Sequence, residues 1–180
     1  MEAMEVIKTR RSIRKFTDQP VTKEEIEEIV AAAAYAPSWK NTQTARYTFV
    51  SDPEVKAQIA NECMMEFSKN TETLNGAPAV VVLSTIVSRS GYERDGSFTT
   101  ALGTHWQSFD AGIAAEAFCL AAHELGLGTV IMGIFDGEKV AKAISLPEGQ
   151  QVSALITIGH PAEEPKAPVR KSVSDLLRSI

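Results

Sequence analysis

The sequence predicts one soluble domain in which helices alternate with buried strands. Its 180 residues are enough for one compact core, whereas two halves would each be marginally stable. The composition, 44% hydrophobic and 23% charged, is that of a folded globular protein. Stretches with the helical period alternate along the chain with short apolar runs that are typical of strands. We therefore treat residues 1–180 as a single domain whose residues 159–180 form a C-terminal arm.

The first part of the chain predicts two helices, a loop and a strand. Residues 3–9 are typical of a short helix. A second helix begins at Thr22, which forms a capping box with Glu25. It ends before the polar loop 37–43, which opens with a proline. The aromatic and β-branched residues of 45–51 then predict a strand.

The next segment predicts a helix, a buried strand and a long loop. Asp52 and Pro53 begin the helix, whose apolar stripe faces the core. The stripe consists of Val55, Ile59, Cys63 and Phe67. Residues 79–86 are continuously apolar, as expected of a strand covered on both faces. Residues 87–104 are polar and contain glycine, so we expect a mobile loop.

The last third predicts a buried helix between short strands. Residues 107–125 are apolar on most sides of a helix, which places this helix in the centre or at a subunit interface. Gly126 is positioned to end it. Residues 129–133 predict a strand, Asp136 caps a further helix, and residues 152–159 predict another buried strand.

The tail from His160 onward predicts an extended arm. Pro161, Pro165 and Pro168 prevent a regular element before residue 172. Such an arm is long for a compact domain, and we expect it to embrace a partner subunit.

Charge and hydropathy exclude several classes of protein. The net charge of -5 and pI of about 5.3 argue against a general binder of nucleic acid or of membrane surfaces, which needs a broad basic surface. No apolar run approaches the roughly 20 residues that span a bilayer, and the N-terminus lacks the apolar stretch of a signal peptide. We expect a cytoplasmic protein. Cys63 and Cys119 fit small core residues better than a disulfide.

Several familiar site patterns are incomplete in this chain. Gly126, Gly128 and Gly133 do not have the spacing of a dinucleotide fingerprint, and they follow a helix instead of opening one. Cys119 and His123 lie one helical turn apart, but no further ligand completes a metal site, so we predict no metal. The chain also has no GxSxG motif, so nothing supports Ser/His/Asp hydrolysis.

The segment from Arg10 to Phe16, RRSIRKF, is the strongest candidate site. Together with Lys8 it holds five of the chain's 18 basic residues within eight positions. Guanidinium groups around a hydroxyl suit a phosphate, because charge-assisted bidentate bonds are strong. An ordinary basic surface patch is the alternative, with about equal weight if the segment stood alone.

Five motifs occur in an order that resembles the nitroreductase family. They are RRSIRKF, APSWKNTQ, DAGIAAEAF, LGLGTVIMGIFD and IGHPAEEPKAPVRK. Together they span nearly the whole chain and are similar to the short, single-domain form of the family. The resemblance implies an α+β fold with a central, mostly antiparallel sheet flanked by helices. It also implies a homodimer with exchanged C-terminal arms and with FMN in a cleft at the interface.

The resemblance also assigns cofactor-binding roles. Arg10, Arg11 and Ser12 would meet the ribityl phosphate, and Arg14 would lie near flavin N1 and O2, where a cation stabilises the reduced ring. Arg170 would complete the phosphate clamp. Lys171 would join it, although a solvated neighbour is an equal alternative.

The remaining assignments concern the ring. Pro37, Ser38 and Asn41 would reach the flavin from the other subunit. Asn70 would bond the pyrimidine edge, with a helix C-terminal asparagine as an even alternative. The backbone N–H of Gly133 would approach N5, and a strand-ending glycine is the alternative. The chain departs from the family at Thr73, where a lysine is frequent.

The implied activity is that of an FMN-dependent NAD(P)H oxidoreductase. NADH or NADPH would reduce the flavin, which would then reduce a nitroaromatic, quinone or related small molecule in a ping-pong cycle without a catalytic side chain. Trp39, Trp106 and Phe109 are candidates for the substrate face. Two alternatives remain: specialised flavin chemistry, namely reductive dehalogenation or flavin fragmentation, and a flavin-binding protein without turnover. The sequence does not choose between NADH and NADPH.

Overall fold

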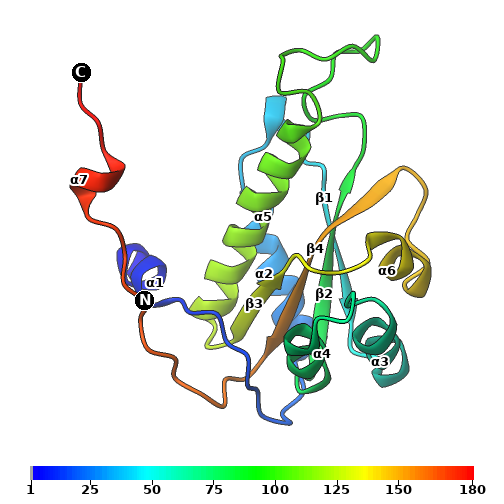
Figure 1. Cartoon of the computed structure of the whole chain (residues 1–180), viewed down its shortest axis with the longest axis vertical. Helices are drawn as coiled ribbons and strands as arrows, with labels where there is room; N and C mark the ends of the chain where they lie inside the picture. Colours follow the sequence, from blue (N-terminus) through cyan, green and yellow to red (C-terminus); the bar gives the residue numbers. More distant parts are fainter. Residues whose placement is uncertain (1) are drawn as a thin grey trace.

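The computed structural model describes residues 2–180 and is built around a four-stranded sheet of order β1-β2-β4-β3 (Figure 1). The strands are β1 (Ala45–Val50), β2 (Ala79–Ile86), β3 (Gly128–Met132) and β4 (Gln150–Gly159). Every neighbouring pair is antiparallel. The expected α+β class and antiparallel sheet are therefore confirmed.

Helices cover the sheet on both faces. They are α1 (Ala3–Thr9), α2 (Lys23–Ala33), α3 (Pro53–Glu62), α4 (Ser68–Asn75), α5 (His105–Glu124), α6 (Gly137–Ala143) and α7 (Val173–Leu176), with a 3-10 turn η1 (Trp39–Asn41). In β2, Val81 and Leu83 join the core that α2 and α5 complete. Val80 and Val82 point the other way, to α3, α4 and α6. This double coverage explains why residues 79–83 are apolar without alternation, although the buried strand continues through the polar Ser84 and Thr85.

Short-range capping signals determine where the helices begin. Thr22 and Glu25 form the reciprocal capping box of α2. Asp52 accepts hydrogen bonds from the first N–H groups of α3, and Asp136 does the same for α6. Gly126 has a left-handed φ of 80° directly after α5, so its predicted role as a stop is confirmed.

The predicted apolar stripe of α3 extends one turn too far. The helix ends at Glu62, and Met65 and Glu66 take left-handed φ values of 48° and 59°. Phe67 then lies at the start of α4 and is 37% exposed. As a result Asn70 lies in the first turn of α4, so the helix C-terminal alternative for this residue is wrong.

Residues 87–104 contain no helix or strand, as predicted, but they are folded back on themselves. Tyr92 and Phe98 form an isolated antiparallel bridge, with ring centroids 4.8 Å apart. Ser90, in the same segment, is fully buried. This segment therefore has internal packing of its own.

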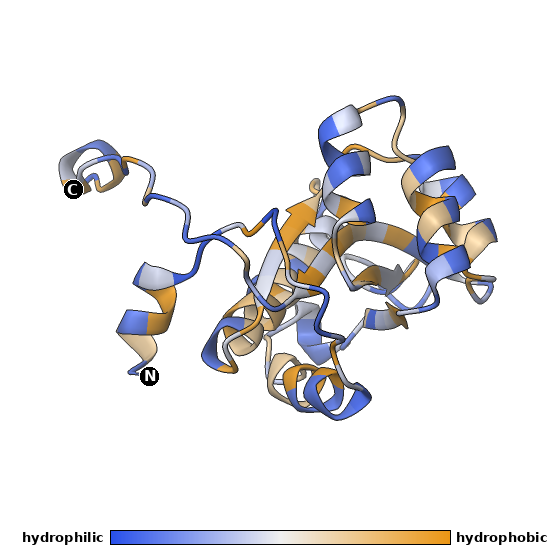
Figure 2. Ribbon diagram, turned by 90° about the horizontal axis from the view of Figure 1, so that it is seen from below, coloured by the Kyte–Doolittle hydropathy of each residue, from blue (hydrophilic) through white to orange (hydrophobic). Residues whose placement is uncertain are grey.

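The two ends of the chain project from the body of the molecule (Figure 2). After β4 the arm is extended and largely exposed until Ser172 caps the short helix α7. Within residues 2–180, no helix is both long and apolar enough to cross a membrane.

Candidate functional site

The basic segment lies along the outer edge of β3. The backbone N–H of Ile13 donates to the carbonyl of Thr129 at 2.9 Å, and Ser12 forms a parallel bridge with Thr129. Gly128 permits this approach, because a Cβ there would lie 2.7 Å from the Ile13 side chain. The sheet edge thus fixes the backbone from which the arginines project.

Arg10 and Arg11 line a cavity of about 380 Å³ between the end of α1, the start of β3 and the first residues of the arm. Arg10 Nε is buried without a hydrogen-bond partner and lies 3.6 Å from a carboxylate oxygen of Glu116. One terminal nitrogen of Arg11 donates to the carbonyls of Lys8 and Arg10, at 2.7 and 2.8 Å. A buried guanidinium nitrogen without a bond suits an anionic ligand in this cavity.

His123 lies beside these arginines and is held neutral. Burial lowers the pKa of His123, and the positive charge of Arg10 lowers it further. Its Nε2 lies 2.8 Å from Thr9 Oγ1, whose hydroxyl donates to Glu5 O at 2.7 Å. Because the hydroxyl hydrogen is committed, Nε2 carries the proton and donates to Thr9.

Arg14 is exposed beside the same sheet edge. Its backbone N–H donates to Glu163 at 2.9 Å, which anchors the start of the arm. Its guanidinium contacts only the carbonyl of Ser12, at 3.5 Å, among the described hydrogen bonds. The charged end of Arg14 is therefore available to a ligand.

Asn70 is bonded to the chain just beyond the far end of β3, where Gly133 lies. Asn70 Nδ2 donates to the carbonyl of Ile134 at 3.2 Å, next to Gly133. The carbonyl of Thr129 points away from β4, because it accepts the Ile13 N–H at the outer edge of the sheet. Backbone groups two residues apart in a strand point the same way, so those of Ile131 also face the open edge. Gly133 is the first residue after β3, and a Cβ there would meet nothing within 4 Å.

Pro37, Ser38 and Asn41 belong to a loop held in place by a buried carboxylate. Asp110 of α5 accepts the Trp39 N–H at 3.0 Å and the Ser90 hydroxyl at 2.6 Å. Sequence reasoning missed Asp110. Its one signal was a carboxylate directly before the apolar run that begins at Ala111.

Three aromatic residues meet beside this loop. The rings of Trp39 and Trp106 have centroids 4.5 Å apart, and those of Trp106 and Phe109 are 5.5 Å apart. Phe109 is 59% exposed. The three proposed substrate-face residues therefore form one cluster.

Arg170 and Lys171 lie on the exposed arm, and neither lines the cavity of Arg10 and Arg11 in the single chain. Thr73 is buried, and its hydroxyl donates to Lys69 O within α4 at 2.8 Å. The Thr73 hydroxyl is therefore bonded within its own helix, and it does not supply the positive charge that a lysine would bring at this position.

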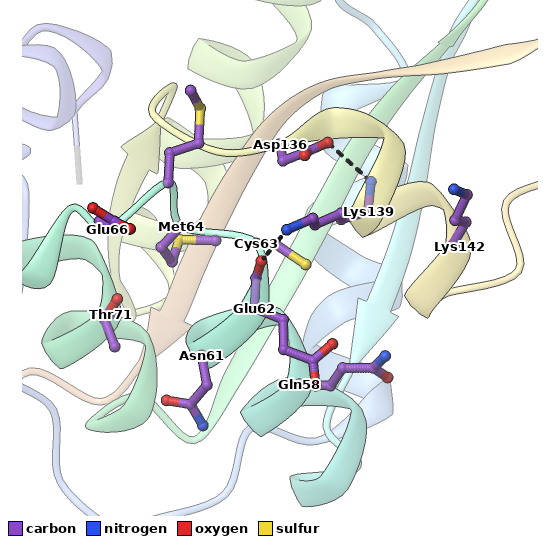
Figure 3. Close-up of a pocket in the computed structure, with 11 residues that line it drawn as sticks. Gln58, Asn61, Glu62, Cys63, Met64, Glu66, Thr71, Asp136, Lys139 and Lys142 are labelled. Atoms are coloured by element: carbon purple, nitrogen blue, oxygen red, sulfur yellow. Dashed lines mark hydrogen bonds between the residues drawn. The ribbon is translucent and has the colours of Figure 1, made fainter.

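A larger cavity, of about 790 Å³, opens between α3, α4 and α6 (Figure 3). Lys139 reaches across it to the carbonyl of Glu62 at 3.3 Å, and its backbone N–H donates to Asp136. Charges of both signs line it, and none of the predicted cofactor residues does. Its size therefore does not make it the functional site.

Comparison with known proteins gives the family. The model of the nitroreductase family matches residues 7–160. A protein of Archaeoglobus fulgidus, provisionally named NADH dehydrogenase/NAD(P)H nitroreductase, is 32% identical over 167 residues, 91% of this chain and 87% of that protein. The NAD(P)H FMN reductase of Bacillus subtilis is 32% identical over 171 residues, 88% of this chain and 67% of that protein.

Solved structures agree with these matches. A nitroreductase family protein from Clostridium novyi NT superimposes with a TM-score of 0.77 at 30% identity, covering 93% of this chain and 89% of that one. The family model covers most of the chain, including the basic segment, α5 and the sheet. This chain belongs to the nitroreductase family.

Proposed function

We propose that this protein is an FMN-dependent oxidoreductase that uses NAD(P)H to reduce nitroaromatic, quinone or related small molecules. The observation that carries the proposal is the arrangement along β3. An arginine-lined cavity, in which Arg10 Nε is buried without a hydrogen bond, lies at one end of the strand. An open backbone edge leads to Gly133 at the other. A relative that carries the name FMN reductase supports the cofactor.

The basic segment holds the phosphate in this proposal. Arg10, Arg11 and Ser12 bind its oxygens, each charge-assisted bond contributing roughly 1.5–3 kcal/mol. Arg170 and Lys171 complete the clamp when the arm of the assembled protein closes. Arg14 lies near N1 and O2 of the ring, where its charge favours the reduced form.

The ring lies against residues from two subunits. Asn70 and the Gly133 N–H meet its polar edge, while Pro37, Ser38 and Asn41 come from a second copy of the chain. An apolar groove on α2 and α5 supports the homodimer. It is lined by Tyr35, which is 91% exposed, and by Phe109. Exposed apolar surface of this kind marks an interface.

When bound, FMN would supply the hydride chemistry between NAD(P)H and the second substrate, in a ping-pong order. The residues of the chain bind the cofactor, orient its ring and shield it from water. The fixed cations stabilise negative charge, and the Gly133 N–H is a preorganised donor. Trp39, Trp106 and Phe109 offer an aromatic surface on which planar acceptors stack. No side chain needs to act as an acid or a base.

Anaerobic titration of the FMN-loaded protein with NADH and with NADPH tests the function. We expect bleaching of the flavin that nitroaromatics or quinones reverse, and a steady-state panel of acceptors then ranks the substrates. Absence of bleaching with both nucleotides would leave a flavin-binding protein without turnover. Bleaching that only a halogenated substrate reverses, or loss of the flavin itself, would support the specialised chemistries.

A further inference from the structure

Asp110 is a carboxylate buried within the apolar helix α5, where its side chain is 4% exposed. An ionised carboxylate in such surroundings is costly unless it is paired or hydrogen-bonded. No ion pair to Asp110 is found among residues 2–180. Its oxygens instead accept hydrogen bonds from two donors, the Trp39 N–H at 3.0 Å and the Ser90 hydroxyl at 2.6 Å.

These bonds tie together three parts of the chain that are distant in sequence. Trp39 lies in the loop 37–43, Ser90 lies in the segment 87–104, and Asp110 lies on α5. A second, exposed link joins the same two loops, because Lys40 Nζ lies 2.8 Å from Glu93 Oε1. The link through Asp110 depends on a carboxylate that is 4% exposed, whereas the Lys40–Glu93 pair is open to solvent, where ion pairs contribute little.

The loop 37–43 needs such an external anchor. Lys40, Asn41 and Gln43 have φ values of 45°, 54° and 48°, in the left-handed region that residues with a Cβ avoid. Within the loop, the Gln43 N–H donates to Ser38 Oγ at 2.9 Å. A strained backbone persists only where surrounding contacts determine its shape.

We propose that Asp110 is the positioning residue that presets the loop 37–43 for FMN before the cofactor binds. The proposal rests on the function proposed above, in which Pro37, Ser38 and Asn41 contact the ring. By accepting the Trp39 N–H, the carboxylate fixes the backbone between Ser38 and Asn41. Nothing requires Asp110 itself to touch the cofactor.

The test compares Asp110→Asn with Asp95→Asn. Asparagine keeps the size of Asp110 but carries no charge and has an NH2 donor in place of one oxygen. The Trp39 N–H, which lies 3.0 Å from both carboxylate oxygens, would therefore face a donor on one side and only a neutral acceptor on the other. Asp95 is a matched control in the segment 87–104. It accepts the N–H and hydroxyl of Ser97, at 3.0 and 2.6 Å, and has no bond to the loop 37–43.

We expect Asp110→Asn to weaken FMN binding about 10-fold, the scale of one lost charge-assisted bond, and to change the visible circular dichroism of bound flavin. Asp95→Asn should change neither. Unchanged affinity and dichroism in Asp110→Asn, or equal losses in both variants, would overturn the proposal. Failure of the wild type to bind FMN would instead overturn the proposed function.

Hydrogen exchange in the wild-type apoprotein tests the same idea if Asp110→Asn does not fold. The Trp39 and Ser97 amides both donate to a carboxylate, but only the first donates to a carboxylate that is itself buried. A preset loop predicts that the Trp39 amide exchanges at least about 10-fold more slowly than the Ser97 amide without FMN. Equal rates would show that the loop is ordered only by the cofactor.

Discussion

Gly133 follows the open edge of β3, where a side chain would project into empty space. The proposed function needs its backbone N–H and not its lack of a Cβ. Gly133→Pro removes the donor, so we expect reduction by NAD(P)H to slow at least about 100-fold, the scale of one lost preorganised donor. Gly133→Ala keeps the N–H and should be milder. Stopped-flow reduction under anaerobic conditions measures both, and a normal rate in the proline variant would exclude the role.

His123 gives the fold a pH dependence at the arginine-lined cavity. Its pKa is lowered mainly by burial, so the folded protein binds this proton less readily than the unfolded chain. The contribution to stability is complete above the ordinary pKa of about 6.5 and is lost as the pH falls through the lowered value. His123→Gln keeps a donor for Thr9 and does not titrate.

We therefore expect the melting temperature of the wild type to fall more steeply than that of His123→Gln between about pH 7 and pH 5. Exposed His105 provides the control, because His105→Gln should follow the wild type. Parallel curves for the wild type and His123→Gln would show that the neutral state of His123 contributes nothing to folding.

At the scale of elements, the sequence predicted the features that depend on neighbouring residues. It did not predict those that depend on tertiary contacts. Caps at Thr22, Asp52 and Asp136 could be predicted because the bonds close within three residues. The end of α3 could not, because Met65 and Glu66 are ordinary residues in a left-handed conformation. Neither residue is a glycine or an asparagine, so the sequence contains no turn signal at this point.

The residues of the candidate site show the same difference between local and long-range signals. The segment that begins at Arg10 stood out because its charges are adjacent in sequence, and the fold gathers Arg10 and Arg11 in one cavity. Asp110 was missed because its partners, Trp39 and Ser90, are 71 and 20 residues away. Arg170 does not line this cavity in the single chain, and its assignment to the phosphate stays a prediction that the proposed homodimer would have to fulfil.

The connection between α3 and α4 makes a testable prediction about strain. Glu66 has a φ of 59°, a conformation that costs a residue with a Cβ about 1–2 kcal/mol. Glu66→Gly removes this cost but increases the conformational entropy of the unfolded chain. We therefore expect the free energy of unfolding to stay the same or to rise by about 0.5–1 kcal/mol. Gln58→Gly, on the exposed face of α3, should lose about 1 kcal/mol. Urea unfolding measures both, and equal losses would contradict the strain.

At the scale of the whole molecule, the apolar groove of α2 and α5 predicts an obligate homodimer. Such interfaces commonly bury more than about 2,000 Å². We expect a dimeric mass by light scattering, and Phe109→Glu should produce monomers that lose FMN because the site is shared. Phe98→Glu is the control, since Phe98 is 55% exposed but lies outside the groove. A monomeric wild type that binds FMN would exclude the shared site.

The outer edge of β3 has a consequence for solubility. Only its first part is covered, by Ser12 and Ile13, while Ile131 remains 45% exposed beside backbone groups that no strand pairs. Bare strand edges are the surfaces through which sheets of separate molecules join into aggregates. In the proposed function the flavin would lie against this edge, so bound cofactor would also reduce aggregation by covering the unpaired backbone groups. Turbidity should therefore rise faster in concentrated apoprotein than in the FMN-loaded protein. Deletion of residues 1–13 should increase the turbidity further, because it exposes the part of β3 that Ser12 and Ile13 cover.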